Sequence, residues 1–323
     1  MVARRDQTTH RGRDWRHRPQ WARDAQTPSE FRCGTPAPAE PMRLPPRLLP
    51  LLERGLIDAV VRPLMSGKEA QVYLIESQGE LRVAKVYKEA DKRAFRQAVS
   101  YTEGRKVKNS RRARAMEKGT RYGRQEQEAA WQSAEVDALH QLARAGVRVP
   151  QPYNFLEGVL LMELVTDAEG NAAPRLNDVA LEPALALAYH GFLIGQVVRM
   201  LCAGIVHGDL SEFNILVAAD GPVIIDLPQA VSAAGNNNAK AMLERDVGNL
   251  ATYFGQFAPE LLTTEYGLEI WSLFEAGKLT PEVVLTGQFK RDDTPVDVGG
   301  VMREIEDVKK DEERRQLYRA LEQ

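Results

Sequence analysis

The residues of this chain best suited to chemistry are two aspartates and an asparagine. Asn214 follows Asp209 by five residues, and Asp226 ends the next short apolar run. Transfer of a γ-phosphoryl group needs a carboxylate to orient the attacking hydroxyl and further oxygen ligands for Mg²⁺. A loop can offer Asp209 to the acceptor and Asn214 to the metal, while Asp226 reaches the same metal from the end of the next strand. The spacing therefore predicts a phosphoryl-transfer centre.

A simpler interpretation of the same residues is structural. His207, Gly208 and Asp209 would form an ordinary turn, and Asp226 would be a carboxylate at the end of a strand. Phosphoryl transfer is favoured because three independent parts agree in order and spacing.

A lysine at the centre of an apolar strand is a further candidate. Lys85 lies in the segment LRVAKVY, where a cation is costly unless it is paired. A phosphate-binding lysine is held by a glutamate of the following helix, which offers Glu126, Glu128 and Glu135. Glu135 is the predicted partner because its apolar neighbours face the core. The alternative is a surface lysine on an edge strand.

A turn between the first two predicted strands is the candidate phosphate loop. Gly67 allows backbone N–H groups to approach phosphate, and Ser66 and Lys68 add a donor and a charge. The common GxGxxG pattern is absent, so an ordinary hairpin turn is a close alternative.

The segment Met162, Glu163, Leu164 and Val165 lies where a hinge between two lobes is expected. There the backbone C=O of Glu163 and the N–H of Val165 are predicted to meet the edge of an adenine. Side-chain identity matters little for that task.

The elements that must position these residues follow from apolar periodicity and breaker residues. Strands are predicted at 60–65, 70–75, 81–87 and 158–164, and helices at 48–56, 125–145, 236–257, 260–276 and 301–321. The pattern indicates an α+β chain, with a small mixed lobe followed by a mainly helical part.

Composition divides the chain further. Residues 1–45 hold nine arginines and five acids, a net charge of +4, so the remainder of a chain of net charge −2 carries −6. This Arg-rich head has too few apolar residues to fold and is predicted to be disordered. The predicted domain covers 46–285, with a first lobe at about 46–162 and a second at 163–285. Residues 286–323 form a charged, partly helical extension.

The most hydrophobic run, 184–206, is interrupted by Tyr189, His190, Gln196 and Arg199. A membrane span needs about 18 or more apolar residues, so a buried helix is predicted and no membrane partner is expected. Cys33 and Cys202 are far apart, which argues against a disulfide framework. The head has no apolar segment typical of a signal peptide, and a cytoplasmic location is expected.

A strongly basic segment interrupts the first lobe. Residues 105–124 carry nine Lys or Arg against one acid, a net charge of +8. Such a run is either a solvated loop or a surface that grips RNA phosphates. Tyr122 is its one aromatic residue, so stacking on bases is weakly supported.

Together these motifs resemble the RIO family of atypical protein kinases, most closely its first subfamily and a bacterial-type member. The resemblance rests on the segments SGKEAQVY at 66–73, AKVYK at 84–88, HGDLSEFN at 207–214, IDLPQAV at 225–231, Trp131 ahead of Glu135, and Arg245, Asp246, Val247, Asn249, Tyr253 and Phe254. It departs from the family at Gly208, where alanine or another small residue is common.

The resemblance implies a two-lobed protein-kinase-like fold that lacks the activation segment and the peptide-docking helices. It implies Mg·ATP as cofactor, Asp209 as the catalytic aspartate, Asn214 and Asp226 as Mg²⁺ ligands, and an ion pair between Lys85 and Glu135. Ser66, Gly67 and Lys68 would lie over the phosphates. Family members act in ribosomal subunit maturation, and some work chiefly as ATPases with a phosphorylated metal-site aspartate, here Asp226.

Three activities fit these residues. The first is a serine/threonine protein kinase acting on a protein or on itself. Ser211 stands where common kinases keep a lysine, which predicts slow transfer to peptides. The second is an ATPase switch in ribosome assembly. The third is a small-molecule kinase of the aminoglycoside type, against which stand the phosphate loop, Pro228 with Gln229, and the basic segment.

The RNA hypothesis is tested by replacing the arginines of 105–124 with glutamine. We expect weaker binding to ribosomal RNA and a smaller loss of affinity with salt, since fewer phosphates are neutralised. Fluorescence anisotropy over a series of salt concentrations measures both. Unchanged binding would leave only a solvated loop.

Overall fold

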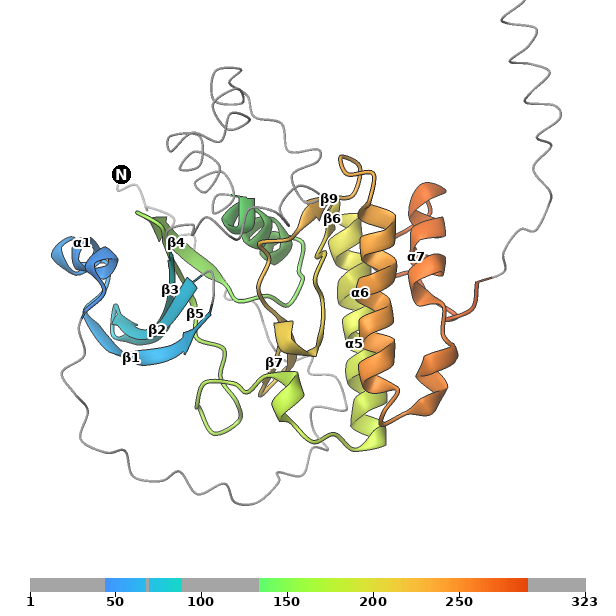
Figure 1. Ribbon diagram of the computed structural model, residues 1–323, viewed down its shortest axis with the longest axis horizontal. Coiled ribbons are helices and arrows are strands. Elements are labelled where there is room, and N and C mark those ends of the chain that lie inside the picture. The colour runs from blue at the N-terminus through green and yellow to red at the C-terminus, as the bar shows by residue number, and fades with distance from the viewer. Residues whose placement is uncertain (1–43, 68–69, 89–133, 290–323) are drawn as a thin grey trace, which may run out of the picture. The chain divides into compact units, whose positions relative to one another are not determined.

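The computed structural model describes residues 44–67, 70–88 and 134–289 (Figure 1). The chain divides into two units, Met1–Gln288 and Phe289–Gln323, and the elements below belong to the first. Several predictions lie outside the described residues: nearly all of the Arg-rich head, Lys68, the segment 105–124, the start of the helix predicted at 125–145, and the helix predicted at 301–321.

Five antiparallel strands form one sheet in the order β1-β2-β3-β5-β4. The strands are β1 (Ala59–Ser66), β2 (Ala70–Ser77), β3 (Glu80–Tyr87), β4 (Pro152–Leu156) and β5 (Val159–Glu163). The four predicted strands correspond to β1, β2, β3 and β5 and are confirmed. The sequence did not predict β4.

The register of β2 and β3 is set by a two-residue turn. Ser77 pairs with Glu80, and the two residues between them, Gln78 and Gly79, have φ values of 57° and 74°. Positive φ at both positions matches the twist of a two-residue hairpin. This register places Lys85 opposite Val72.

Alternate side chains of β3 face two different layers, as in any pleated strand. Ala84 and Val86 pack with Leu48 and Leu51 from the segment that contains the 3₁₀ helix η2 (Pro46–Leu48) and α1 (Leu49–Glu53). Tyr87 belongs to the larger core on the other face. Because β3 pairs with β2 and β5, Lys85 is not on an edge strand, and that alternative is excluded.

The helix that follows the first three strands is described over 134–144. Val136, Leu139 and Leu142 are buried in the larger core, together with Leu160 of β5. The helix therefore packs on the Tyr87 face of the sheet, the face opposite α1.

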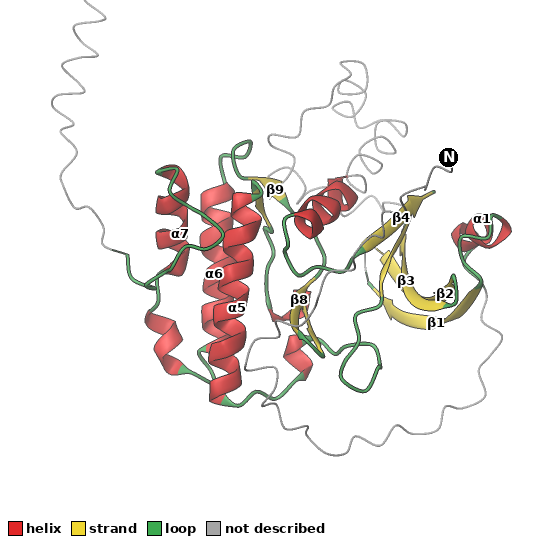
Figure 2. Ribbon diagram, turned by 180° about the vertical axis from the view of Figure 1, so that it is seen from behind, coloured by secondary structure: helices red, strands yellow, loops and turns green. Residues whose placement is uncertain are grey.

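The second lobe is built on three helices. They are α5 (Pro183–Cys202), α6 (Ala239–Phe254) and α7 (Tyr266–Glu275), which run side by side in both ribbon views (Figure 2). Two antiparallel strand pairs lie before α6: the hairpin of β7 (Ile215–Ala218) with β8 (Gly221–Ile224), and the pair of β6 (Ile205–Val206) with β9 (Val231–Ser232). The α+β class is confirmed, and α6 begins soon after Asp226, without a long intervening segment.

Two local predictions need correction. The helix predicted at 260–276 is broken into the 3₁₀ helix η6 (Pro259–Thr263) and α7, because Thr264 is extended with ψ of 142°. Two consecutive threonines disfavour a continuous helix there. β4 was missed because its first residue is Pro152, which was read as a helix stop; a proline is tolerated at the start of an edge strand.

By length and composition, α5 is one helix among the described residues that is long and apolar enough to cross a membrane. A core helix of a soluble protein passes the same test. Over half of its most apolar window is buried inside the protein, and Leu193, Val197 and Leu201 belong to the main core.

A buried histidine on α5 is held neutral by its surroundings. His190 is 2% exposed and packs against the rings of Phe254 and Tyr266. Its Nε2 has no hydrogen-bond partner among the described residues. Burial lowers the pKa of His190 from 6.5 to about 4.

This histidine predicts an acid-sensitive fold. The pKa of His190 is lower in the folded state than in the unfolded state, so protonation favours unfolding. The full stability of the fold is present above pH 6.5, and part of it is lost as pH falls toward 4. We expect the free energy of unfolding to drop by about 3 kcal/mol over that range. Urea denaturation of the wild type and of His190→Phe measures the effect. Equal pH dependence in both proteins would contradict it.

Candidate active site

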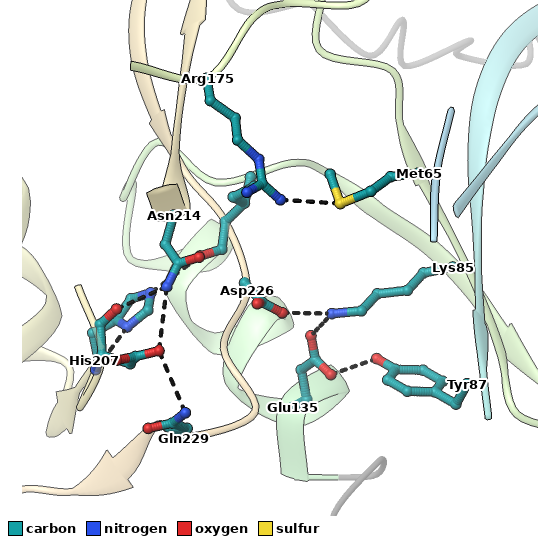
Figure 3. Close-up of polar contacts among 11 residues, drawn as sticks. Met65, Lys85, Tyr87, Glu135, Arg175, His207, Asn214, Asp226 and Gln229 are labelled. Atoms are coloured by element: carbon teal, nitrogen blue, oxygen red, sulfur yellow. Dashed lines mark hydrogen bonds and ion pairs between the residues drawn. The ribbon is translucent and has the colours of Figure 1, made fainter. Parts of the chain in front are cut away.

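Lys85 and Glu135 form the predicted ion pair. Lys85 Nζ lies 2.6 Å from Glu135 Oε1, and the hydroxyl of Tyr87 donates to Glu135 Oε2 at 2.7 Å (Figure 3). The Glu135 side chain is 4% exposed, so both of its oxygens are satisfied inside the protein. Glu126 and Glu128 lie outside the described residues.

Lys85 also contacts the second lobe. Its Nζ lies 2.9 Å from Asp226 Oδ1, so one ammonium joins two carboxylates. Burial acts to lower the pKa of Lys85, but the charges of Glu135 and Asp226 outweigh it and raise that pKa above the ordinary value. Burial acts to raise the pKa of Asp226, but the combined attraction of Lys85, His207 and Arg175 outweighs it and lowers that pKa.

Asp226 has an unusual backbone conformation. Its φ is 67°, a left-handed value that costs an L-residue about 1–2 kcal/mol. Its side chain is 44% exposed and points toward Lys85 (Figure 3). Strain of this kind is typical of functional positions. Here it turns the carboxylate out of the end of β8 toward the cation.

The loop after β6 carries Asp209 and Asn214. Asn214 Nδ2 donates to the backbone oxygen of Asp209 at 2.8 Å, and it lies 3.5 Å from Asp209 Oδ2. These contacts orient the amide and leave Asn214 Oδ1 as the end available to a metal. One amide oxygen and one carboxylate, Asp226, suit Mg²⁺, which keeps several waters and takes few protein ligands.

No group of three or more His, Cys, Asp or Glu side chains that could hold a metal occurs within residues 44–67, 70–88 and 134–289. The candidate site therefore differs from carboxylate-rich calcium sites and from thiolate or imidazole zinc sites.

A glutamine that sequence reasoning did not place in the site contacts Asp209. Gln229 Nε2 donates to Asp209 Oδ2 at 3.3 Å. The side chain comes from the segment between Asp226 and β9. Its position after Pro228 in the IDLPQ segment was the available signal. Gln229 restrains the carboxylate that would orient an acceptor hydroxyl.

A buried aspartate on α6 holds the backbone of the Asp209 loop. Asp246 accepts hydrogen bonds from the N–H groups of Gly208 at 2.8 Å and Leu210 at 3.0 Å. The residues on either side of Asp209 are thus tied to one carboxylate. Burial raises the pKa of Asp246, against the lowering effect of His207 and of these two N–H groups.

Two neighbours on α6 complete this support. Arg245 donates to the carbonyl of Gly208, and Asn249 Nδ2 donates to the carbonyl of Leu210 at 3.0 Å. Sequence reasoning noted Arg245, Asp246 and Asn249 but gave them no role. For Asp246 the available signal was a charged residue at a buried position of a helix, since such a residue must have partners in the fold.

His207 links the loop to the strand before Asp226. Its Nδ1 accepts from the N–H of Asp209 at 3.3 Å, so Nε2 carries the proton and donates to the carbonyl of Ile225 at 3.1 Å. Gly208 has φ of 81°, a conformation that favours glycine. The departure from the family pattern at this position therefore suits the local backbone.

The candidate phosphate loop is held from β3. Lys88 Nζ donates to the carbonyl of Gly67 at 2.6 Å and lies 3.3 Å from Ser66 Oγ. Ser66 and Gly67 are described, whereas Lys68 is not. Lys88 was quoted in the sequence motif without a role, and the structure shows it against this turn.

Two backbone hydrogen bonds outside the strand ladders hold the hinge segment. The N–H of Glu163 donates to the carbonyl of Gln151, and the carbonyl of Val165 accepts from Ala173, both at 2.9 Å. These bonds use neither the Glu163 carbonyl nor the Val165 N–H. Met162 is part of β5, paired with Val83.

The side chain of Glu163 forms an ion pair with Arg148. Arg148 donates to both of its oxygens, at 3.0 and 3.1 Å. The carbonyl of Arg148 accepts from the N–H of Ile224, the last residue of β8. The hinge is thus connected to the strand that leads to Asp226.

Comparison with known families matches residues 71–266 to the RIO domain. The matched segment covers more than half of the chain and contains Lys85, Asp209, Asp226 and Asp246. The chain belongs to the RIO family. Its likeness to a bacterial-type member stays a prediction.

Individual relatives agree with this family. The RIO-type serine/threonine-protein kinase Rio1 of Haloferax volcanii is 36% identical over 63% of this chain and 66% of its own length. The serine/threonine-protein kinase rio1 of Schizosaccharomyces pombe is 29% identical over 64% of this chain and 40% of its own. The chain thus spans less than two thirds of these relatives. A Rio2 kinase-ADP/Mg²⁺-phosphoaspartate complex from Chaetomium thermophilum aligns over 73% of each chain, with 20% identity and a TM-score of 0.46.

The support of the Asp209 loop by Asp246 is testable with Asp246→Asn. An amide keeps the shape but removes one acceptor, which leaves a buried backbone N–H unpaired. We expect a loss of about 1–3 kcal/mol in the free energy of unfolding, and faster hydrogen exchange at the amides of Gly208 and Leu210. The exposed Asp137→Asn serves as the control. Unchanged exchange at both amides would contradict this role.

Proposed function

We propose that this chain is a Mg·ATP-dependent RIO-type serine/threonine protein kinase that transfers the γ-phosphate to a protein or to itself. The observation that carries the proposal is the convergence of Lys85, held by Glu135, on Asp226 beside the loop of Asp209 and Asn214. Family membership and the names of the relatives support it.

Each side chain then has a defined task. Asp209 orients the acceptor hydroxyl and takes its proton, a contribution of about 10²–10⁴ in rate. Lys85 binds the ATP phosphates, and Glu135 keeps its ammonium in place. Mg²⁺, when bound by Asn214 and Asp226, supplies positive charge to the phosphoryl oxygens.

The remaining groups bind the nucleotide. Ser66, Gly67 and Lys68 cover its phosphates, and the backbone of Glu163 and Val165 meets the adenine beside Met162. Lys88, which contacts the Gly67 carbonyl, holds the covering turn against the sheet.

An ATPase switch is the second candidate. It is favoured by Ser211, which stands where common kinases place a lysine that steadies the moving phosphoryl group. Asp226 would then itself be phosphorylated, and water would complete the turnover.

Partners and location are part of the same proposal. The resemblance to the family supports a role in ribosome maturation. The +8 charge of 105–124 supports contact with ribosomal RNA or a pre-ribosomal particle, together with the Arg-rich head. A cytoplasmic location agrees with such partners.

The test follows radiolabelled γ-phosphate from Mg·ATP in the wild type, Asp209→Ala and Asp226→Asn, with Asp137→Asn as control. We expect label on serine in the wild type and the control, and a loss of about 10²-fold or more in Asp209→Ala. Asp226→Asn should also lose the label, because a metal ligand is removed.

Other outcomes separate the alternatives. Alkali-labile label with phosphate release, abolished by Asp226→Asn, would establish the ATPase switch. ATP consumption stimulated by aminoglycosides or amino alcohols would indicate a small-molecule kinase. A wild type with neither label nor hydrolysis would refute an active enzyme.

A further inference from the structure

Arg175 is anchored directly beside the candidate metal site. It forms an antiparallel bridge with Leu216 of β7, two residues after Asn214. On either side of this bridge, the N–H of Val217 donates to the carbonyl of Pro174, and the carbonyl of Arg175 accepts from Asp178, both at 2.9 Å. The backbone of Arg175 is therefore fixed relative to Asn214.

The side chain of Arg175 reaches from the second lobe toward the phosphate turn. Its Nη2 lies 3.0 Å from Sδ of Met65, the residue of β1 that precedes Ser66 (Figure 3). In Figure 3 its guanidinium and Lys85 approach Asp226 from different directions.

The guanidinium of Arg175 has more hydrogen-bond donors than its contacts in the structure use. It has five N–H donors, and a thioether is a weak acceptor. No carboxylate lies within 4 Å of it in the part of the chain that the structure describes. Lys85, by contrast, is already bound to two carboxylates. Arg148, a guanidinium at the hinge, is likewise bound by Glu163 and Asp220.

We propose that Arg175 is a further nucleotide-binding residue whose guanidinium makes a bidentate contact to the polyphosphate of ATP. The inference rests on the proposed function, since it assumes that a nucleotide occupies this cleft. A planar fork of donors fits phosphate oxygens, and such charge-assisted pairs are about twice as strong as neutral hydrogen bonds. ATP would thus be bound by Lys85 on the sheet side and by Arg175 on the β7 side.

A structural alternative is that Arg175 only ties the second lobe to Met65. That contact involves a neutral sulfur and an exposed methionine, 40% accessible, so it offers little stabilisation. The two interpretations differ in what loss of the guanidinium does to ligands with and without phosphates.

The experiment measures Mg·ATP and adenosine binding by calorimetry in the wild type, Arg175→Gln and Arg175→Lys. Arg54→Gln is the matched control, because Arg54 forms an exposed ion pair with Glu157 outside the cleft. We expect Arg175→Gln to weaken Mg·ATP binding about tenfold and to leave adenosine affinity within about twofold. Arg175→Lys should also weaken Mg·ATP binding, since lysine lacks the bidentate fork.

The outcomes keep the two proposals apart. The thermal midpoint of each Arg175 variant shows whether it folds. If a folded variant binds Mg·ATP as tightly as the wild type does, the role of Arg175 is overturned. Equal losses for Mg·ATP and adenosine also overturn it, because the contact would not involve phosphate. If the wild type does not bind Mg·ATP, the proposed function itself fails.

Discussion

The buried cation at Lys85 is the constraint on which the rest of this structure depends. An ammonium at the centre of a five-stranded sheet must be paired, and removal of one partner of a buried pair costs about 3–5 kcal/mol. Glu135 from the helix 134–144 and Asp226 from the end of β8 supply the partners. These contacts therefore specify where that helix packs, and they draw Asp226 toward the sheet.

A second set of contacts holds the Asp209 loop from behind. The α6 residues Arg245, Asp246 and Asn249 bind the backbone on both sides of Asp209, and His207 connects the loop to Ile225. Asp209 itself remains exposed, with its carboxylate restrained by Gln229. The candidate catalytic side chain of Asp209 is thus carried by a loop whose backbone is hydrogen-bonded on both sides. Such support keeps the position of a loop residue precise.

Sequence reasoning was most successful where burial and periodicity act together. The strands around Lys85 were predicted because their apolar alternation is strong, and Glu135 was chosen because its neighbours face the core. It failed where local signals conflict. Pro152 suggested a stop but begins the edge strand β4, and the segment 260–276 has helical composition but is interrupted at Thr264.

The sequence by itself determined which residues are candidates for chemistry: the order and spacing of Lys85, Asp209, Asn214 and Asp226 predict phosphoryl transfer. Only the tertiary structure showed which other side chains lie against these candidates and the segments that carry them. Asp246 contacts Gly208, Gln229 contacts Asp209, and Arg175 contacts Met65. In each pair the two residues are far apart in the sequence, so their local spacing does not indicate the contact. Their positions follow from how helices and strands pack, which a residue pattern does not encode locally.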